Sequence, residues 1–244
     1  MSAPTDTSTL QLRLQGHGFA FVTAEGMREL LGAPQDLADW PAFAASWDDL
    51  APDSYLAARG HQRRRRHAVF SVDAAGEIHR APHQPHYQSL QHNPLQGDIQ
   101  RWFMPIRPAI ANGASLRRIV AFAGALFGGM DPATPRWQVE AHQFRIEARV
   151  DAPGEPTPEG VHRDGVDYVL VLLIDRVNIE SGTTTIHAPD GALLGSFTLA
   201  HTLDAALVDD ARVCHGVTAV TAFDPGRPAY RDVLVVTFKA AHRG

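Results

Sequence analysis

The pattern of hydrophobic and polar positions along the chain changes near residue 136. Before that point, apolar residues follow Thr23 at helical spacing, and the stretch 115–130 (SLRRIVAFAGALFGGM) is amphipathic and ends in glycines. Thr23 is suited to cap a helix, and terminal glycines favour a helix end. The pattern therefore predicts a short helix over 23–33 and a long helix over 115–130.

Three further elements are predicted before residue 136. The run LQLRLQGHGFAFV (10–22) alternates like an opening strand, after a disordered lead-in over the first ten residues. A second helix is expected over 36–50, with an uncertain start because Pro41 lies inside it. The segments on either side of 74–76 read as a β-hairpin.

After residue 136 the chain consists of short β-rich runs separated by turn residues. Seven or so such strands predict an antiparallel sandwich or jelly roll. The expected fold class is mainly β with helices (α+β), as a single domain over 1–244. In that domain 1–136 would form a mixed layer of helices and strands, packed on a core formed mostly by 137–244.

Composition restricts the class of protein. The 244 residues are 44% hydrophobic and 20% charged, with a net charge of −5, so a general nucleic-acid or membrane-surface binder is not expected. No apolar run reaches the roughly 20 residues of a spanning helix, and the start carries no secretory signal. The single cysteine, Cys214, indicates a reducing compartment, and we expect a cytoplasmic location.

The candidate chemistry begins with His162 and Asp164, one residue apart before an apolar strand. On an extended backbone their side chains project from the same face, and Gly165 lets the chain bend close to a bound ion. Such pairs also occur in ordinary turns, so a third ligand is needed. His215, in a later strand, is the best candidate, and His187 is the alternative.

Two histidines and one carboxylate leave half of a metal's coordination sphere open, which is typical of non-haem Fe(II) oxygenases. The same donors would suit a catalytic zinc hydrolase. A third alternative is a jelly-roll module that binds a small ligand or senses stress without turnover.

Arg231 is the first residue of an otherwise apolar strand. A guanidinium at the edge of a core requires an anionic partner, and a carboxylate fits it best. That partner would be a bound ligand or, alternatively, a neighbouring acid such as Asp224 or Asp232.

Other polar residues are expected to be structural. His83, His86, His92 and His142 have no carboxylate at a useful spacing, and Asp204, Asp209 and Asp210 look like loop charges. The run Arg63–Arg66 would alternate along a strand, mostly on a solvated face.

The ordered motifs HRD (162–164), His215 and RDVLVVTF (231–238) resemble those of the Fe(II)/2-oxoglutarate-dependent dioxygenases, which have a double-stranded β-helix (jelly-roll) core. Residues 158–186 and 215–238 are similar to the small bacterial group of free-amino-acid hydroxylases that includes L-isoleucine 4-hydroxylase. The resemblance extends more faintly to 87–106 and covers roughly 60–240 in all.

This resemblance implies a set of roles. Fe(II) would be held by His162, Asp164 and His215. Arg231, with Arg227 as the substitute, would bind the distal carboxylate of the cosubstrate 2-oxoglutarate. Dioxygen would be consumed, and succinate and CO2 released. A loop with Tyr87, Gln88 and Arg101 would meet a small substrate, most plausibly a free L-amino acid or derivative. The position oxidised, the choice among hydroxylation, desaturation and sulfoxidation, and the oligomeric state, a homodimer included, stay open.

Overall fold

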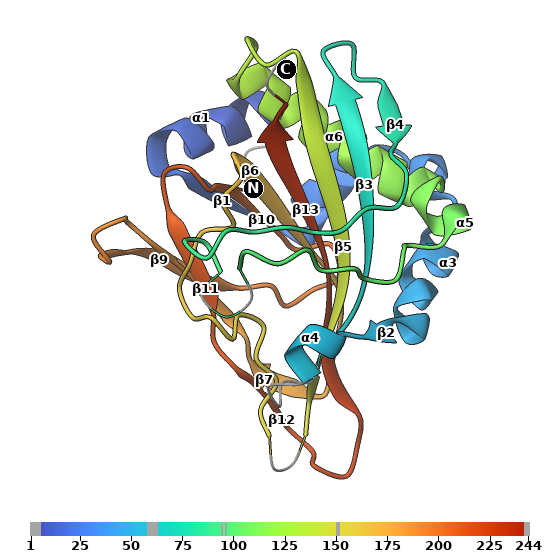
Figure 1. Cartoon of the computed structure of the whole chain (residues 1–244), viewed down its shortest axis with the longest axis vertical. Coiled ribbons are helices and arrows are strands. Elements are labelled where there is room, and N and C mark those ends of the chain that lie inside the picture. The colour runs from blue at the N-terminus through green and yellow to red at the C-terminus, as the bar shows by residue number, and fades with distance from the viewer. Residues whose placement is uncertain (1–5, 58–62, 94, 96, 150–151, 242–244) are drawn as a thin grey trace.

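The fold is dominated by one large antiparallel sheet, seen in a computed structural model that describes residues 6–57, 63–93, 95, 97–149 and 152–241 (Figure 1). Its strands follow one another across the sheet in the order β1 (Phe19–Val22), β10 (Ala205–Asp209), β6 (Tyr168–Val177), β13 (Ala229–Ala240), β5 (Arg136–Ala148), β3 (Arg63–Asp73) and β2 (Ala51–Pro52), and β4 (Ile78–Arg80) pairs with β3. Strands from before and after residue 136 therefore share one sheet.

Two smaller antiparallel sheets complete the β architecture. One contains β11 (Cys214–Val217), β8 (Thr183–His187) and β9 (Leu193–Thr198), and the other pairs β12 (Val220–Ala222) with β7 (Ile179–Ser181). Ile186 of β8 packs with Val169 and Val208 of the large sheet. The result is two layers of antiparallel sheet that are not closed into a barrel, so the predicted mainly β fold class is confirmed.

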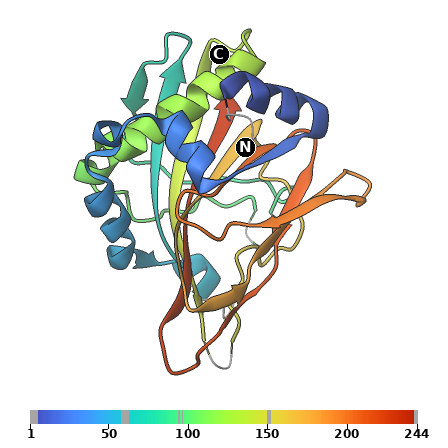
Figure 2. The same ribbon diagram turned by 180° about the vertical axis from the view of Figure 1, so that it is seen from behind.

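Helices cover the other face of the large sheet, as the view from behind shows (Figure 2). They are α1 (Thr7–His17), α2 (Ala24–Leu31), the 3₁₀ turns η1 (Pro34–Leu37) and η2 (Ser46–Asp49), α3 (Trp40–Ala45), α5 (Pro108–Ala111) and α6 (Ala114–Met130). The short helix α4 (Ser54–Ala57) lies on the opposite side of the sheet (Figure 1). The predicted helices over 23–33 and 115–130 and the hairpin of β3 and β4 are confirmed. The predicted helix over 36–50 is instead divided into η1, α3 and η2.

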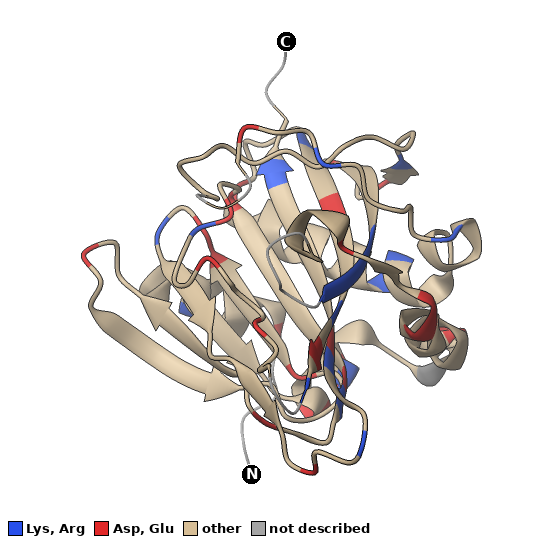
Figure 3. Ribbon diagram, turned by 60° about the horizontal axis from the view of Figure 1, so that its bottom comes forward, with Lys and Arg blue, Asp and Glu red and all other residues tan. Residues whose placement is uncertain are grey.

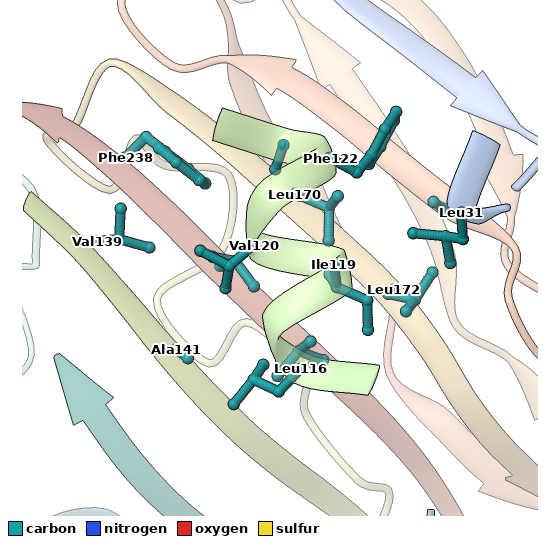
Figure 4. Packing of buried hydrophobic residues seen from close by; sticks show 14 of the residues in the cluster. Leu31, Leu116, Ile119, Val120, Phe122, Val139, Ala141, Leu170, Leu172 and Phe238 are labelled. Atoms are coloured by element: carbon teal, nitrogen blue, oxygen red, sulfur yellow. The ribbon is translucent and has the colours of Figure 1, made fainter. Parts of the chain in front are cut away.

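Helix α6 holds this layer to the sheet. Its apolar residues recur every three or four positions, so Leu116, Ile119 and Val120 form one buried face. That face packs on β5 and the neighbouring strands, including Val139 and Ala141 (Figure 4). Burying a Leu or Ile side chain stabilises a fold by about 1.5–3 kcal/mol, so α6 makes a large contribution to fixing the sheet.

The prediction of a strand over 10–22 is wrong for its first part. Residues 7–17 form α1, because Asp6 caps the helix by accepting a 2.7 Å hydrogen bond from the Thr9 amide. Leu10 and Leu14 then lie four residues apart on one buried face, and Gly18, at φ 78°, ends the helix. The lead-in predicted over the first ten residues is likewise helical from residue 7, while residues 1–5 lie outside the described chain.

Among the described residues, none of the helices combines the length and the apolar content that crossing a lipid bilayer requires.

Candidate active site

A cavity of about 710 Å³ lies against the face of the large sheet opposite the layer formed by α1, α2, α3, α5 and α6, and Leu56 of α4 borders it. Side chains on a strand alternate between its two faces, so every second residue of β5 and β13 points into it. Phe144 and Val235 give it an apolar wall, and Glu140, His142 and Arg231 add polar groups from the same strands.

The structure brings His162, Asp164 and His215 together at one end of this cavity. His162 lies in the loop before β6, and it forms an isolated antiparallel bridge with His215 of β11, with two backbone hydrogen bonds of 2.9 Å. The Asp164 carboxylate lies 3.5 Å from Nε2 of His162 and 3.6 Å from Nε2 of His215. One ligand atom from each residue lies within 4.8 Å of the others, so all three can reach a single metal ion.

The electrostatics of this triad favour a bound cation. Burial alone would lower the pKa of His162, but the hydrogen bond and negative charge of Asp164 outweigh it and raise the pKa to about 9. Burial alone would raise the pKa of Asp164, but the hydrogen bond from His162 and the charge of His215 lower it. The carboxylate is therefore ionised and ready to bind a metal.

Asp210 positions the loop that carries Asp164. Its carboxylate is 1% exposed and accepts hydrogen bonds from the backbone amides of Asp164, Gly165 and Val166 at 3.0, 2.8 and 3.2 Å. Gly165 has φ 79°, and a Cβ there would lie 2.5 Å from the ring of His92, so glycine is required. The expectation that Asp210 is a loop charge is wrong.

Asp204 and Asp209 are buried as well, at 2% and 7% exposure, so the same expectation fails for all three. Asp204 accepts hydrogen bonds from the amides of Ala24, Ala200 and His201, each at 2.8 or 2.9 Å. The sequence feature that could have indicated this burial is the position of the three aspartates at the ends of the buried strand β10, where backbone amides need hydrogen-bond acceptors.

Arg231 lies in the same cavity and is 2% exposed. Within the described part of the chain, its Nε and Nη2 have no hydrogen-bond partner. Burial, and then the charge of Arg176, lower its pKa to about 10, so it remains a cation at neutral pH. An unpaired buried guanidinium is costly, and this one is placed to receive a carboxylate.

The alternative partners of Arg231 do not pair with it. Asp232 accepts hydrogen bonds from Arg145 at 2.8 and 2.7 Å, on the opposite face of the sheet. Asp224 lies in an exposed loop, where its backbone amide and carbonyl bind the Asn178 side chain. Arg227 is exposed in that same loop and does not line the cavity, so the structure does not bring this substitute to the site.

His187, the alternative metal ligand, is not part of the triad. It lies on β8, where its Nδ1 is 3.2 Å from the Gly191 carbonyl oxygen. His215 lies on the neighbouring strand β11 of the same small sheet, and it is this histidine that reaches Asp164.

The loop between β4 and α5 covers the cavity and carries the three predicted substrate contacts. Tyr87 borders the cavity, is 55% exposed and donates a 3.1 Å hydrogen bond to Asp98. Arg101 is 1% exposed and donates to Oε1 of Gln88 at 2.7 Å, so it is buried under the loop and not at its surface. Gln88 in turn donates to the backbone oxygen of Asp164 at 3.3 Å.

Sequence reasoning missed a second polar cluster in the cavity wall. Oε2 of Glu140 lies 2.6 Å from Nδ1 of His86, 3.1 Å from Nε2 of His67 and 3.4 Å from Nε2 of His142. The expectation that His86 and His142 have no carboxylate partner is therefore wrong. The one local signal was the spacing of Glu140 and His142, two residues apart on a strand, which places both on one face.

The Arg63–Arg66 run alternates across β3, as predicted, but the expectation of a mostly solvated face is wrong, because only Arg64 of the four is exposed. Figure 3 shows it as a continuous basic stretch at one end of the strand. Arg63 and Arg65 line the cavity, while Arg64 and Arg66 pair with Glu147 and Asp49 outside it. The inward pair thus adds positive charge to the cavity wall.

Comparison with known proteins agrees with this geometry. The family model for 2OG-Fe dioxygenases matches residues 44–237. The chain is 24% identical, over 93% of its length and 93% of the relative's, to 3(1)-hydroxy-L-isoleucine 4-dioxygenase of Pantoea ananatis. A crystal structure of a bsmA homolog from Methylobium petroleophilum PM1 has a TM-score of 0.89 and 35% identity, covering 99% of this chain and 96% of that one.

A third similar structure is the Fe(II)/(alpha)ketoglutarate-dependent dioxygenase TqaL, with a TM-score of 0.76 and 21% identity over 97% of this chain and 87% of that one. This likeness confirms the expected double-stranded β-helix fold. Because the family model spans most of the sequence, the chain belongs to the 2OG-Fe dioxygenases, the non-haem iron enzymes that use Fe(II), 2-oxoglutarate and dioxygen.

Proposed function

We propose that this enzyme hydroxylates a small substrate, a free L-amino acid or a close derivative, and releases succinate and CO2. Iron would be held by His162, Asp164 and His215, and the distal carboxylate of 2-oxoglutarate by Arg231. One observation carries the proposal: a two-histidine, one-carboxylate triad and an unpaired buried arginine share one cavity. When bound, iron and 2-oxoglutarate supply the oxidising chemistry.

The protein's own part is to orient the reactants and exclude water. Val169, Val171, Val233 and Val235 form an apolar stretch of the cavity wall on β6 and β13, and these side chains offer water no hydrogen-bond partner. Arg231 would hold the cosubstrate at a fixed position on β13, since the strand is paired on both sides. Such fixed placement favours one reaction geometry over others.

The substrate assignment is supported by the cavity and by the relatives. A volume of about 710 Å³ suits a small molecule together with the cosubstrate. Arg101 supplies a buried cation for a substrate carboxylate, Gln88 holds that cation in place, and Tyr87 lies at the rim. The Pantoea ananatis relative is named for action on a hydroxylated isoleucine.

The zinc-hydrolase alternative is disfavoured by Arg231. Hydrolysis by a zinc-bound water needs no inward cation on β13, whereas a chelating dicarboxylate needs one. A module without turnover is disfavoured by membership of a dioxygenase family.

The decisive test is spectroscopic. Anaerobic addition of Fe(II) and 2-oxoglutarate should give a weak visible charge-transfer band, and a panel of free L-amino acids should identify one that increases succinate formation. The Asp164→Ala variant should lose both. Retention of the band and of succinate formation by this variant would refute the assignment.

A further inference from the structure

Glu140 is a carboxylate in the cavity whose partners are all imidazoles. Its Oε2 contacts His67, His86 and His142 at 2.6–3.4 Å, and among the described residues no lysine or arginine forms an ion pair with it. The side chain is 14% exposed and borders the cavity. No cation of the described chain contacts this carboxylate directly, so it remains available to a cationic group of a ligand.

The protonation of the cluster follows from Arg65. Its Nη2 lies 2.7 Å from Nδ1 of His142, and a guanidinium can only donate. Nδ1 of His142 is therefore the acceptor, and its proton is on Nε2, which faces Glu140. Burial lowers the pKa of His67, His86 and His142, so all three are neutral donors near pH 7.

These donors keep Glu140 ionised. Burial alone would raise the pKa of Glu140, but the hydrogen bonds from His142, His67 and His86 outweigh it and lower the pKa far below its ordinary value. The imidazoles supply hydrogen bonds but no positive charge. The carboxylate thus keeps its full charge at the cavity wall.

The wall beside Glu140 is rich in cations. Arg65 is 3% exposed, and its guanidinium lies 3.5 Å from the ring centre of Phe103. Asp53 is shared between Arg63, at 2.8 Å, and Arg65, at 3.6 Å. Arg101 adds a third guanidinium to the cavity wall. This part of the wall can accept a ligand anion.

We propose that Glu140 binds the α-ammonium group of the substrate while Arg65 and Arg101 face its carboxylate. The substrate class is then the free α-amino acid in its zwitterionic form, and N-acylated and 2-hydroxy counterparts are rejected. His86 and His142 act as positioning residues that hold the Glu140 carboxylate. This inference rests on the proposed function, since it concerns the substrate end of the same cavity.

The competing occupant of the cluster is a second metal ion, because ligand atoms of His67, His86, Glu140 and His142 lie within 4.8 Å of one another. The Arg65 contact argues against it. A metal on Nε2 of His142 would require the proton on Nδ1, where it would meet the N–H of Arg65. A nearby guanidinium also repels a divalent cation.

The test compares substrates that differ only at the amine. The free L-amino acid that gives most succinate in the panel is assayed beside its N-acetyl and 2-hydroxy counterparts. For the wild type, both counterparts should give at least tenfold lower kcat/KM. Glu140→Gln should raise the KM for the amino acid about 10- to 100-fold, as expected for the loss of a charged hydrogen bond. Its charge-transfer band with Fe(II) and 2-oxoglutarate is recorded as well, so that a loss of iron or cosubstrate binding is distinguished from a loss of substrate recognition.

Two further variants separate recognition from folding. Glu140→Asp keeps the charge and should recover part of the preference for the amine. Glu147→Gln makes the same chemical change on the outer face of β5, where Glu147 pairs with Arg64, and should leave every value unchanged.

Three results would overturn the inference: equal use of the N-acetyl or 2-hydroxy counterpart, an unchanged KM in Glu140→Gln, or no free amino acid that stimulates turnover. In each case a normal charge-transfer band would leave the iron and 2-oxoglutarate assignment intact, whereas loss of the band in the wild type would count against the proposed function itself. The metal alternative is checked with Co(II) on the His162→Ala/Asp164→Ala variant. We expect this double variant to bind no Co(II). If it binds one equivalent of Co(II), and if this binding is lost when Glu140→Gln is introduced as a third substitution, the inference would also be overturned.

Discussion

The side-chain amide of Gln88 donates to the backbone oxygen of Asp164 at 3.3 Å and to its Oδ1 at 3.4 Å. The same side chain accepts a hydrogen bond from Arg101. One residue of the covering loop therefore contacts both a candidate metal ligand and a candidate substrate cation. The two ends of the cavity are joined through it.

Replacing Gln88 should affect both ends. We expect Gln88→Leu to weaken Fe(II) binding about tenfold, because hydrogen-bonding partners of metal ligands typically contribute 10- to 100-fold in affinity. The KM for the amino-acid substrate should also rise. Metal titration of the apoprotein and steady-state succinate assays measure the two effects. Gln91→Leu, at an exposed position of the same loop, is the control and should change neither.

Matched variants of Arg231 and Arg227 test which of the two arginines binds 2-oxoglutarate. Arg231→Gln should raise the KM for 2-oxoglutarate about 10- to 100-fold, because a buried charged hydrogen bond is lost. Fe(II) binding should be retained. Arg227→Gln, in the exposed loop, should behave as wild type when the charge-transfer band is titrated with 2-oxoglutarate. The reverse ranking would assign the cosubstrate to Arg227.

Replacing Asp210 should weaken Fe(II) binding, although Asp210 is not one of the proposed iron ligands. In Asp210→Asn, an amide group replaces an acceptor of three backbone N–H groups. We expect about 10- to 100-fold weaker Fe(II) binding and a free energy of unfolding lower by about 1–3 kcal/mol. Asp209→Asn, one residue away and outside the cavity lining, should leave the iron affinity unchanged. Equal iron affinities in wild type and Asp210→Asn would remove the positioning role.

Asp232 should make stability depend on pH. Burial raises its pKa to about 6, and the pair with Arg145 offsets only part of this rise. The folded protein then holds a proton that the unfolded chain, with a pKa of about 3.9, has already released. Stability from this group is complete below about pH 4 and is lost as pH rises through 6.

The measurement is urea unfolding of wild type and Asp232→Asn at pH 5 and pH 7. Between these values the wild type should lose about 1 kcal/mol relative to the variant. Asp190→Asn, in an exposed turn, should show the wild-type pH dependence. A constant difference between wild type and Asp232→Asn at the two pH values would contradict the raised pKa.

Local patterns predicted the elements whose period is unambiguous. The long helix α6 was predictable because its apolar face repeats over several turns. Helix α1 was not, since Leu10, Leu12 and Leu14 fit a strand alternation as well as a helix. In the structure Leu12 is 69% exposed while Leu10 and Leu14 are buried, and only the tertiary contacts decide between the two readings.

The candidate site likewise contains residues that could be predicted from local sequence and residues that could not. His162 and Asp164 are neighbours in sequence, so their shared face could be predicted. The Glu140 cluster could not, because it joins β5 to His67 on β3 and to His86 in a distant loop. The pairing of His67 with His142 depends on the register of β3 and β5, which no local pattern specifies.

The bridge between His162 and His215 has a consequence for how the enzyme acquires its ion. Two of the three candidate ligands are joined by reciprocal main-chain hydrogen bonds of 2.9 Å, and these bonds use backbone groups that take no part in holding an ion. Main-chain pairing therefore fixes the spacing of the two imidazoles, and little ordering entropy is lost when an ion binds between them. Which divalent ion occupies the centre in a cell would then be decided more by supply than by any reshaping of the polypeptide.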